Sequence, residues 1–545
     1  MSYGIVWFKR DLRVHDHAGL DAAARAGPVL CLYVIEPSLW RQPDASTRQY
    51  GFLVESLRAL DASLARRGAR LRVAVGEMPE VLERLAAVAP FAALYAHEET
   101  GNDFTYARDR AVGRWCREHG VAWREFAQFG VVRRLRSRDD WLGHWQAHVA
   151  QPCLPAPDLR TPELPEGFDA APLAWLDEAA GAHAGMSVSP SASTRSGPAS
   201  LSARPPLRLP DPASLGLTMP DAPRRQHGGR PAALEVLGSF LKDRSGRYRG
   251  GISSPLSAPT ACSRISPYLA LGCVSLREVV QATRREIARL GPDDAVRRKG
   301  LSAFTSRLHW HCHFIQKLES EPELEWRNLH RGYDGLRESD WNPTHFDALV
   351  AGRTGWPLVD ACVAMLSETG WINFRMRAML VSVAAYPLWL HWRPVGEWLA
   401  REFVDYEPGI HWSQMQMQSG TTGINTTRVY NPVKQAQDHD PKGAFVRRWL
   451  PAMRRVPDAW LFEPWRMPAD LQARCGVRVG VDIPRPVVDL ASATREAKAR
   501  VHGLRARPEV RAAKAAIVEK HGSRKALAGR RPPPRGEAGQ LTLGF

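Results

Sequence analysis

The sequence lacks the motifs and long apolar runs that mark several large protein classes. Its eight cysteines are scattered and form no Cys-x-x-Cys pair, which argues against a disulfide scaffold, a zinc ribbon or a compact iron–sulfur motif. No run of about 18 apolar residues occurs, so no membrane span is expected. The first apolar run precedes the first basic residues, which is the reverse of a signal peptide. We therefore expect a cytoplasmic protein with no metal site and no membrane contact.

The chain does have an ordinary globular composition and an excess of positive charge. Hydrophobic residues make up 44% and charged residues 24%, which excludes a wholly disordered or fibrous protein. A length of 545 residues predicts about two to four domains. The formal net charge of +17 favours a polyanionic partner, although charge alone does not identify one.

The first part of the chain, residues 1–135, has the pattern of alternating strands and helices. Apolar runs that predict strands occur at residues 4–8, 28–35, 71–75, 91–95 and 121–126. Helical patterns lie between them, with leucines that share one helix face at Leu53, Leu57, Leu60 and Leu64. This alternation predicts a doubly wound α/β domain with a parallel sheet, which binds ligands beyond the carboxyl ends of its strands. No Gly-x-Gly-x-x-Gly follows the first run, so a dinucleotide fingerprint is absent.

The rest of the chain divides by composition into a connector, a helical domain and a tail. Residues 136–229 are expected to connect the domains, and their Ala-, Ser-, Gly- and Pro-rich part, 178–229, predicts a flexible linker. Residues 230–505 have helical periodicity and few strand signals, which predicts a large all-α domain. The tail, 506–545, is basic; it is expected to be mobile and either holds phosphates or only aids solubility.

Tryptophan is concentrated in the predicted helical domain. Twelve of the 19 tryptophans lie between Trp310 and Trp465. For most of them, a helical core that uses tryptophan for bulk is a sufficient explanation. A group this dense is also typical of the surroundings of an aromatic cofactor.

Five segments, in this order along the chain, resemble the DNA photolyase/cryptochrome family. They are Ile5-Val-Trp-Phe-Lys-Arg-Asp-Leu-Arg13, Cys262-Ser-Arg-Ile-Ser-Pro-Tyr-Leu-Ala-Leu-Gly272, Gly352-Arg-Thr-Gly-Trp-Pro-Leu-Val-Asp-Ala361, Thr369-Gly-Trp-Ile-Asn-Phe-Arg-Met-Arg377 and Arg428-Val-Tyr-Asn-Pro432. The resemblance covers residues 3–465 apart from the linker and is closest to the class I type. It implies an antenna-chromophore domain at residues 1–135 and an FAD-binding domain at residues 230–505. A second, folate- or deazaflavin-type chromophore is left open.

The resemblance also implies which residues hold FAD. Those at the flavin phosphates are Tyr248, Cys262, Ser263, Arg264, Ile265 and Ser266. Hydroxyls, a guanidinium and backbone N–H groups at a helix start suit a pyrophosphate, although Ser-Arg-Ile-Ser taken alone is more often a helix cap. Arg377 and Asp405 match an ion pair beside the isoalloxazine ring, because an anionic flavin needs a nearby cation, and Glu407 is expected to contact the cofactor.

Family members that repair DNA flip a pyrimidine dimer out of the duplex and pass it an electron from excited, reduced FAD. Trp310 matches the residue that stacks on the flipped bases, and Arg375 matches a basic residue near the substrate phosphate. Trp392 matches the middle member of the family's tryptophan electron-transfer chain. His411 falls where the family places the residue facing flavin N5, and a histidine there can donate a proton. The alternative for His411 is a structural histidine bonded to the backbone.

Four positions of the expected substrate pocket depart from the family pattern. Arg307 replaces a glutamate; it donates hydrogen bonds but cannot accept the thymine N3–H, so we expect it to contact DNA carbonyls or phosphates. Phe374 replaces an asparagine, and Met415 and Met417 replace two tryptophans. Met415 takes the flavin-proximal position of the electron-transfer chain, where a thioether is no substitute for indole. Trp389 and Trp412 offer another route, and Trp341 is a candidate for the distal member.

The sequence thus favours a light-dependent DNA photolyase that uses reduced FAD to repair pyrimidine dimers, in duplex or single-stranded DNA, by photoinduced electron transfer. A cryptochrome-like blue-light photoreceptor without repair activity is the alternative. A DNA-binding flavoprotein without photochemistry is the third interpretation. The lesion type stays open because the dimer-contacting positions differ.

The last six residues form a short motif outside the family resemblance. Gln540, Leu541, Leu543 and Phe545 resemble the peptide by which bacterial repair proteins dock on the DNA sliding clamp. The preceding Arg531-Pro-Pro-Pro-Arg535 predicts a stiff, extended tether. The alternative is that these apolar side chains fold back on the protein's own surface.

Overall fold

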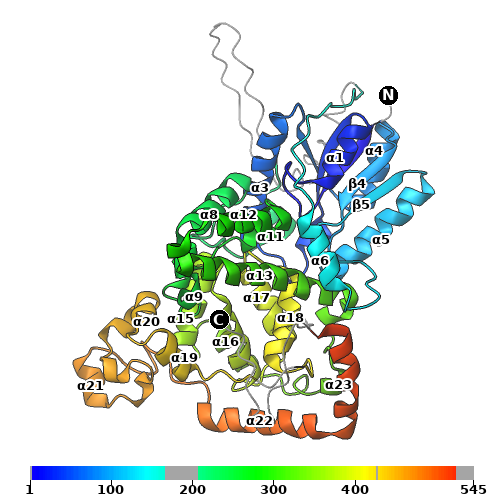
Figure 1. Ribbon diagram of the computed structural model, residues 1–545. Coiled ribbons are helices and arrows are strands. Elements are labelled where there is room, and N and C mark those ends of the chain that lie inside the picture. Colours follow the sequence, from blue (N-terminus) through cyan, green and yellow to red (C-terminus); the bar gives the residue numbers. More distant parts are fainter. Residues whose placement is uncertain (1–2, 166–206, 425–427, 523–545) are drawn as a thin grey trace, which may run out of the picture.

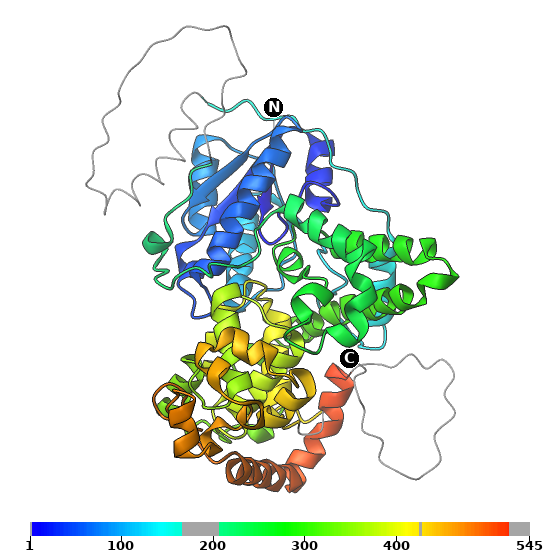
Figure 2. The same ribbon diagram turned by 90° about the vertical axis from the view of Figure 1, so that its left-hand side faces the viewer.

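The computed structural model describes residues 3–165, 207–424 and 428–522 of the chain. In Figure 1 an α/β part built from the first 130 residues lies above a larger helical part. The two parts are packed directly on each other in both views (Figures 1 and 2). In the described ranges, no helix has the length and apolar character needed to cross a bilayer.

The α/β part contains one parallel sheet of five strands in the order β3-β2-β1-β4-β5. The strands are β1 (Gly4–Phe8), β2 (Val29–Ile35), β3 (Leu71–Val75), β4 (Ala93–His97) and β5 (Ala122–Phe126). Val6 and Phe8 enter a different apolar cluster from Ile5 and Trp7, so both faces of β1 are buried. Burial on both faces explains the continuous apolar runs, and the predicted doubly wound fold is confirmed.

Helices cover both faces of this sheet. They are α1 (Ala18–Ala26), α2 (Pro37–Trp40), α3 (Thr47–Ala65), α4 (Met78–Val88) and α5 (Asp103–Glu118). The four leucines of α3 predicted to share a face are all buried in one core cluster. That cluster continues into the helical part through Leu237 and Phe240, so α3 joins the two parts of the molecule.

The connector is packed against the fold wherever the structure describes it. After α6 (Trp141–Ala150), the described chain continues to residue 165 and resumes at residue 207. Leu215 and Leu217 are buried, and Arg225 forms an ion pair with Glu55 of α3 at 3.0 Å. Residues 207–229 are therefore not the flexible linker that composition predicted; residues 178–206 of that linker lie outside the described residues.

The rest of the described chain is mostly helical, as predicted. The helices are α8 (Arg230–Lys242), α9 (Tyr248–Gly251), α10 (Ala258–Ala261), α11 (Ser266–Ala270), α12 (Leu276–Arg289), α13 (Ala295–Ser320), α14 (Pro343–Val350), α15 (Pro357–Thr369), α16 (Phe374–Ala385), α17 (Trp392–Glu402), α18 (Pro408–Ser419), α19 (Pro432–His439), α20 (Ala444–Trp449), α21 (Ala469–Arg474), α22 (Leu490–Ala506) and α23 (Pro508–His521). Helix α18 packs against α13, α16 and α17, and these contacts bring the predicted flavin residues together.

The two parts are joined by arginines that reach from the α/β part into the helical part. Arg10 donates to the Ala270 carbonyl at 2.8 Å and to the Glu407 carboxylate at 2.8 Å. Arg48 of α3 donates to Glu402 at 2.6 Å, and both of these side chains are buried. Both arginines therefore form hydrogen bonds with groups of the other part, although Arg48 Nε is buried without a partner among the described residues.

The basic tail begins with an ordered helix. Helix α23 meets α22 at a sharp bend, and the pair runs along the outside of the helical part (Figure 1). Val510 is 4% exposed, and its carbonyl accepts a hydrogen bond from His330 at 2.8 Å. Residues 508–521 are thus docked on the fold, contrary to the prediction of a mobile tail over this range.

Candidate functional site

The centre of the candidate site is an ion pair between Arg377 of α16 and Asp405, just before α18. The Arg377 Nη2 atom lies 3.0 and 2.9 Å from the two carboxylate oxygens of Asp405. Ser266, at the start of α11, donates from Oγ to Asp405 Oδ2 at 2.7 Å. Arg377 also donates from Nε to the Ile372 carbonyl and lies 4.0 Å from the centre of the Phe403 ring. These contacts fix a guanidinium in a largely apolar environment.

The segment that contains Arg264 turns sharply. Arg264 has φ of +61°, a backbone conformation that side-chain-bearing residues rarely adopt. Its Nε atom donates to Gln226 Oε1 at 2.9 Å, and its guanidinium lies 3.9 Å from the centre of the Trp371 ring. Burial lowers the pKa of Arg264 to about 10, so the side chain stays charged at neutral pH. The structure thus places two cations, Arg264 and Arg377, around the single carboxylate of Asp405.

Two residues that the sequence did not single out hold this turn in place. Arg244 donates to the carbonyls of Cys262 and Ser263, and Gln226 donates from Nε2 to the Arg264 carbonyl at 2.9 Å. Their carbonyl partners are 18 to 38 residues away in the sequence, so no local pattern indicates them. Burial raises the pKa of the Cys262 thiol to about 12, which keeps it neutral.

Tyr248 and Arg307 lie side by side. Tyr248 is 6% exposed and makes edge-on contacts with Phe240 and Phe304. Burial raises the pKa of Tyr248, while the charge and hydrogen bond of Arg307 act in the opposite direction. Arg307, expected to contact DNA, therefore lies against a residue expected to contact the flavin phosphates.

His411 has a defined protonation state. Its Nε2 atom lies 2.9 Å from the Gly396 carbonyl oxygen, which only accepts hydrogen bonds, so Nε2 carries the proton. Burial lowers the pKa of His411 to about 3, so the ring is neutral and Nδ1 is an acceptor. This geometry argues against the proton donation that the sequence suggested. The backbone bond is the contact expected of a structural histidine, and it leaves Nδ1 as an acceptor.

Trp412 and Trp392 form a buried aromatic pair next to His411. The ring centres of His411 and Trp412 are 4.8 Å apart, and those of Trp412 and Trp392 are 5.9 Å apart. Gly396 makes room for them, since a Cβ atom there would lie 2.4 Å from the Trp412 ring. Trp392 donates from Nε1 to Asn328 Oδ1 at 2.8 Å.

The two other candidate tryptophans of the electron-transfer chain have different neighbours. Trp389 is covered by Arg337 and Arg500, whose guanidiniums lie 4.6 and 5.0 Å from its centre. The centre of the Trp341 ring lies 5.0 Å from the centre of the Phe346 ring. Of the two alternative tryptophans, Trp389 and Trp412, the structure therefore places Trp412 next to Trp392.

The residues expected at the substrate lie on two helices. Trp310 of α13 is half-buried and stacks on Phe314, with the two ring centres 5.7 Å apart. Phe374, the first residue of α16, is 38% exposed, which is unusual for a large apolar side chain. Arg375 follows it and lies close enough to His439 to lower that histidine's pKa, after burial as the main cause. An exposed aromatic beside an arginine suits a nucleic-acid surface.

Glu407 lies at the carboxyl edge of the sheet, between the ends of β1 and β4. It accepts the hydrogen bond from Arg10, and its other oxygen, Oε1, is buried without a hydrogen-bond partner among the described residues. Burial raises the pKa of Glu407 to about 7. The cavity here has a volume of about 10 Å³, about the size of one water molecule. The structure thus places Glu407 at the junction of the two parts.

Asp11, His17 and His97 form a buried group at the same edge, with ligand atoms within 4.8 Å of one another. Asp11 Oδ2 lies 2.9 Å from His17 Nε2 and 2.8 Å from His97 Nδ1. His17 Nδ1 accepts from the Leu20 N–H, so His17 Nε2 carries its proton. His97 donates from Nδ1 to the Asp11 carboxylate, whereas His17 Nε2 lies near the same oxygen without hydrogen-bond geometry.

Comparisons with known proteins agree with the fold and the motifs. Residues 4–134 match the family model described as DNA photolyase, and residues 304–503 match the FAD binding domain of DNA photolyase. The deoxyribodipyrimidine photo-lyase of Streptomyces griseus is 31% identical over 510 residues, which cover 90% of this chain and 98% of the relative. The Cryptochrome DASH of Gloeobacter violaceus is 29% identical over 503 residues, covering 89% and 93%.

A solved structure has the same fold over nearly the whole chain. The bacterial class III photolyase from Agrobacterium tumefaciens superposes with a TM-score of 0.74 at 24% identity, covering 93% of this chain and 98% of that one. The sheet order, the helical part around Arg377 and Asp405, and the two matched family models all agree with the motifs in the sequence. The chain therefore belongs to the DNA photolyase/cryptochrome family.

Proposed function

We propose that this protein is a light-dependent DNA photolyase, in which reduced FAD repairs pyrimidine dimers. The observation that carries the proposal is the Arg377–Asp405 pair, in which Asp405 also accepts a hydrogen bond from Ser266 and which is flanked by Arg264. The relative from Streptomyces griseus, named a deoxyribodipyrimidine photo-lyase, supports the same reaction. When bound, FAD would supply the electron, and the protein's part is to hold the cofactor and the substrate.

The charges of the site fit an anionic cofactor such as FAD. Arg264 forms no ion pair with any described residue, although its pKa indicates strong burial of its charge. Arg377 already shares Asp405, so the site has an excess of positive charge. A pyrophosphate and an anionic isoalloxazine ring would balance it. Tyr248, Ser263 and Arg264 would hold the phosphates, and Arg377 would lie at the ring.

Our proposal gives His411 the role of an acceptor. Its Nε2–H is held by the Gly396 carbonyl, which leaves the Nδ1 lone pair for an N–H group. A reduced flavin ring presents such an N–H at N5, and an oxidised ring does not. At the ring edge, His411 would thus favour the reduced cofactor that repair requires.

Repair can be tested directly with the complete protein. Chemically reduced protein is illuminated with oligonucleotides that contain a defined cyclobutane dimer or a (6-4) lesion, as duplex and as single strand. We expect light-dependent restoration of one lesion, none in the dark, and a strong loss in Trp310→Ala, since stacking on a base is worth roughly 1–3 kcal/mol. Illuminated protein that restores neither lesion would refute the proposal.

A blue-light photoreceptor is the second candidate, and a specific observation favours it. Arg307 and Phe374 occupy positions where dimer-repairing relatives carry Glu and Asn, and Arg307 here contacts Tyr248. Another relative, from Gloeobacter violaceus, is named a cryptochrome. Photoreduction followed by slow recovery in the dark, without repair of either lesion, would favour this function.

A second chromophore is a separate question. In open α/β sheets, ligands bind beyond the carboxyl ends of the strands where the strand order reverses, which here lies between β1 and β4. Ion pairs such as Lys9–Asp109 and Arg108–Glu99 fill this position and leave a cavity of about 10 Å³. We therefore expect purified protein to carry FAD alone. A second pigment extracted in equimolar amount would show that this expectation is wrong.

Docking on a sliding clamp also remains a proposal. The motif residues lie outside the described residues, and their sequence supports docking; they are Gln540, Leu541, Leu543 and Phe545. A clamp contact would favour a repair enzyme over a photoreceptor, because a clamp delivers enzymes to DNA.

A further inference from the structure

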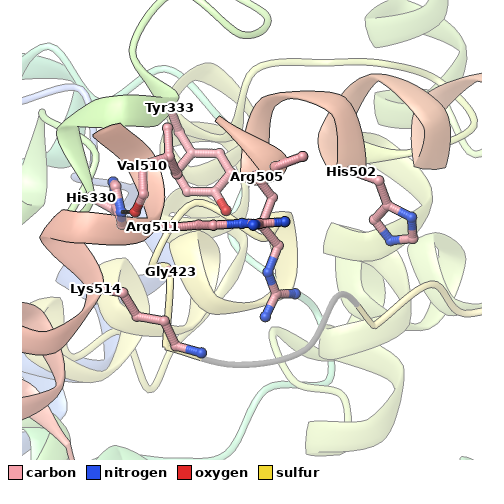
Figure 3. Close-up of a pocket in the computed structure, with 9 residues that line it drawn as sticks. His330, Tyr333, Gly423, His502, Arg505, Val510, Arg511 and Lys514 are labelled. Carbon is pink, nitrogen blue, oxygen red and sulfur yellow. Dashed lines mark hydrogen bonds between the residues drawn. The ribbon is translucent and has the colours of Figure 1, made fainter. Parts of the chain in front are cut away.

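A second pocket lies where the C-terminal helix pair meets the helical part. It has a volume of about 390 Å³. Helices α22 and α23, the short turn at residues 331–333 and the loop at Gly423 form its walls (Figure 3). Its lining shares no residue with the flavin site and consists of His330, Tyr333, Gly423, His502, Arg505, Ala506, Val510, Arg511 and Lys514.

The walls of this pocket are fixed by specific contacts. His330 donates from Nε2 to the Val510 carbonyl at 2.8 Å, and its Nδ1 accepts from the Gly332 N–H at 3.2 Å. Gly423 has φ of +67°, and a Cβ atom there would lie 2.3 Å from the His330 ring. At the far end of α23, His521 lies 2.7 Å from Glu321. Helix α23 is thus anchored at both ends, and the pocket is a built feature of the fold.

The charged side chains of the pocket all have the same sign. Arg505, Arg511 and Lys514 line it, and none of its lining residues in the described part of the chain carries a carboxylate. None of the three forms an ion pair within the described part of the chain, whereas Arg500 on α22 pairs with Asp340 at 3.0 Å. Figure 3 shows Arg505 and Lys514 extending toward the same space, with the Tyr333 hydroxyl near Arg505 and Arg511.

Tyr333 adds a neutral hydrogen-bond donor. It is 2% exposed, and burial raises the pKa of its hydroxyl, with Arg505 acting in the opposite direction. The hydroxyl therefore keeps its proton at neutral pH. Two guanidiniums, an ammonium and a phenol are all donors, and together they match the oxygens of a phosphoryl group.

We propose that this pocket binds the phosphate group of a nucleotide or of a nucleic-acid strand. Its volume of about 390 Å³ is enough for a phosphate together with its sugar and base. The two sources share one chemistry, that of phosphoryl oxygens bound by Arg505, Arg511 and Lys514. The proposal does not depend on repair activity, because the pocket shares no residue with the flavin site.

The test uses the full-length flavoprotein and two matched triple variants. The pocket variant carries Arg505→Gln, Arg511→Gln and Lys514→Gln. The control variant carries Arg495→Gln, Lys498→Gln and Arg507→Gln, which removes the same charge from exposed positions of the same helix pair outside the pocket. Binding of undamaged oligo(dT) is measured by fluorescence anisotropy over a range of salt concentrations, and binding of ATP by calorimetry. Flavin content and thermal melting confirm that the variants fold.

If a nucleic-acid strand occupies the pocket, the pocket variant should bind oligo(dT) about tenfold more weakly than the control variant. The slope of log affinity against log salt should become shallower by about 2, because each phosphate contact to a single strand contributes about 0.7 and the variant loses three such contacts. If a free nucleotide occupies it, the pocket variant alone should lose ATP binding, and both variants should bind oligo(dT) equally. Equal behaviour of the two variants toward both ligands would overturn the proposal.

Discussion

His411 donates a hydrogen bond from Nε2 to the carbonyl oxygen of Gly396 at 2.9 Å, and the same glycine leaves room for the Trp412 ring. One backbone position of α17 therefore controls both the tautomer of a buried histidine and the packing of a buried tryptophan pair. Several expected outcomes depend on this arrangement and on the ion pairs around it.

Replacing Gly396 with alanine should disturb light-driven flavin reduction. The new Cβ atom would lie 2.4 Å from the Trp412 ring and 3.3 Å from Met415, so the ring must move. Overpacking of this kind costs about 1–3 kcal/mol of stability. We expect slower photoreduction in Gly396→Ala, measured by the loss of oxidised-flavin absorbance under blue light.

Single tryptophan replacements should identify the route of photoreduction. Trp412→Phe and Trp392→Phe should each slow it strongly, because these rings are 5.9 Å apart and adjacent to His411. Trp389→Phe and Trp341→Phe serve as matched controls and should have little effect. Fast photoreduction that survives Trp392→Phe would mean that the route does not use this pair.

The Arg377–Asp405 pair should be required for flavin retention. Removing either partner leaves the other as an unpaired, largely buried charge, which costs about 3–5 kcal/mol for a fully buried pair. Arg377 is 21% exposed, so the cost here should be at the lower end of that range. We expect loss of bound FAD from Arg377→Ala and from Asp405→Ala, and a smaller loss from Ser266→Ala. Normal flavin content in both charge variants would contradict the assignment.

Stability should fall as the pH drops below about 6.5, the ordinary histidine value. Burial lowers the pKa of His97 and of His411 to about 3, so both stay neutral in the folded protein while the unfolded chain takes up protons. Each of these two histidines should lower the free energy of unfolding by about 1.4 kcal/mol at one pH unit below 6.5. Urea unfolding between pH 7.5 and 5.5 measures this. His411→Asn should reduce the pH dependence, and an unchanged profile would argue against a neutral His411.

Removal of residues 523–545 should weaken binding to all DNA sequences alike. These residues carry five basic side chains and one acidic side chain, and phosphate contacts position a protein without reading bases. The truncation stops after α23, because that helix is docked through His330 and Val510.

The same truncation, and Gln540→Ala with Phe545→Ala, should abolish capture by a bacterial sliding clamp. Capture that survives both changes would rule out the docking motif.

The strands could be predicted within two residues because the inner strands are buried on both faces and so have continuous apolar runs, whereas the edge strand β5 is partly exposed. The helical periodicity predicted over residues 230–505 has a break that was not foreseen, since α16 ends at Ala385 and α17 begins at Trp392. Pro387 marks this break, because proline has no backbone N–H to continue the helical hydrogen bonds. The flexible linker predicted from composition was also wrong at residues 207–229, because a few buried leucines hold a segment whose average composition is polar.

The pairing of Arg377 with Asp405 could be expected from motifs, but their surroundings could not. Arg244 and Gln226 act on carbonyls that come close only in the folded chain, and the neighbour of Arg307 depends on how α9 lies against α13. The acceptor role of His411 depends on one backbone carbonyl of a different helix. Contacts of this kind have no local sequence signal.

The arginines that cross between the two parts of the molecule determine how it comes apart. Arg10 and Arg48 end on Glu407 and Glu402, and separating the parts would break both ion pairs and expose to water the apolar cluster that the two parts share. A helical fragment that starts at residue 230 should therefore aggregate or stay unfolded when it is expressed alone. The intact chain should instead melt in one cooperative transition, with equal calorimetric and van't Hoff enthalpies.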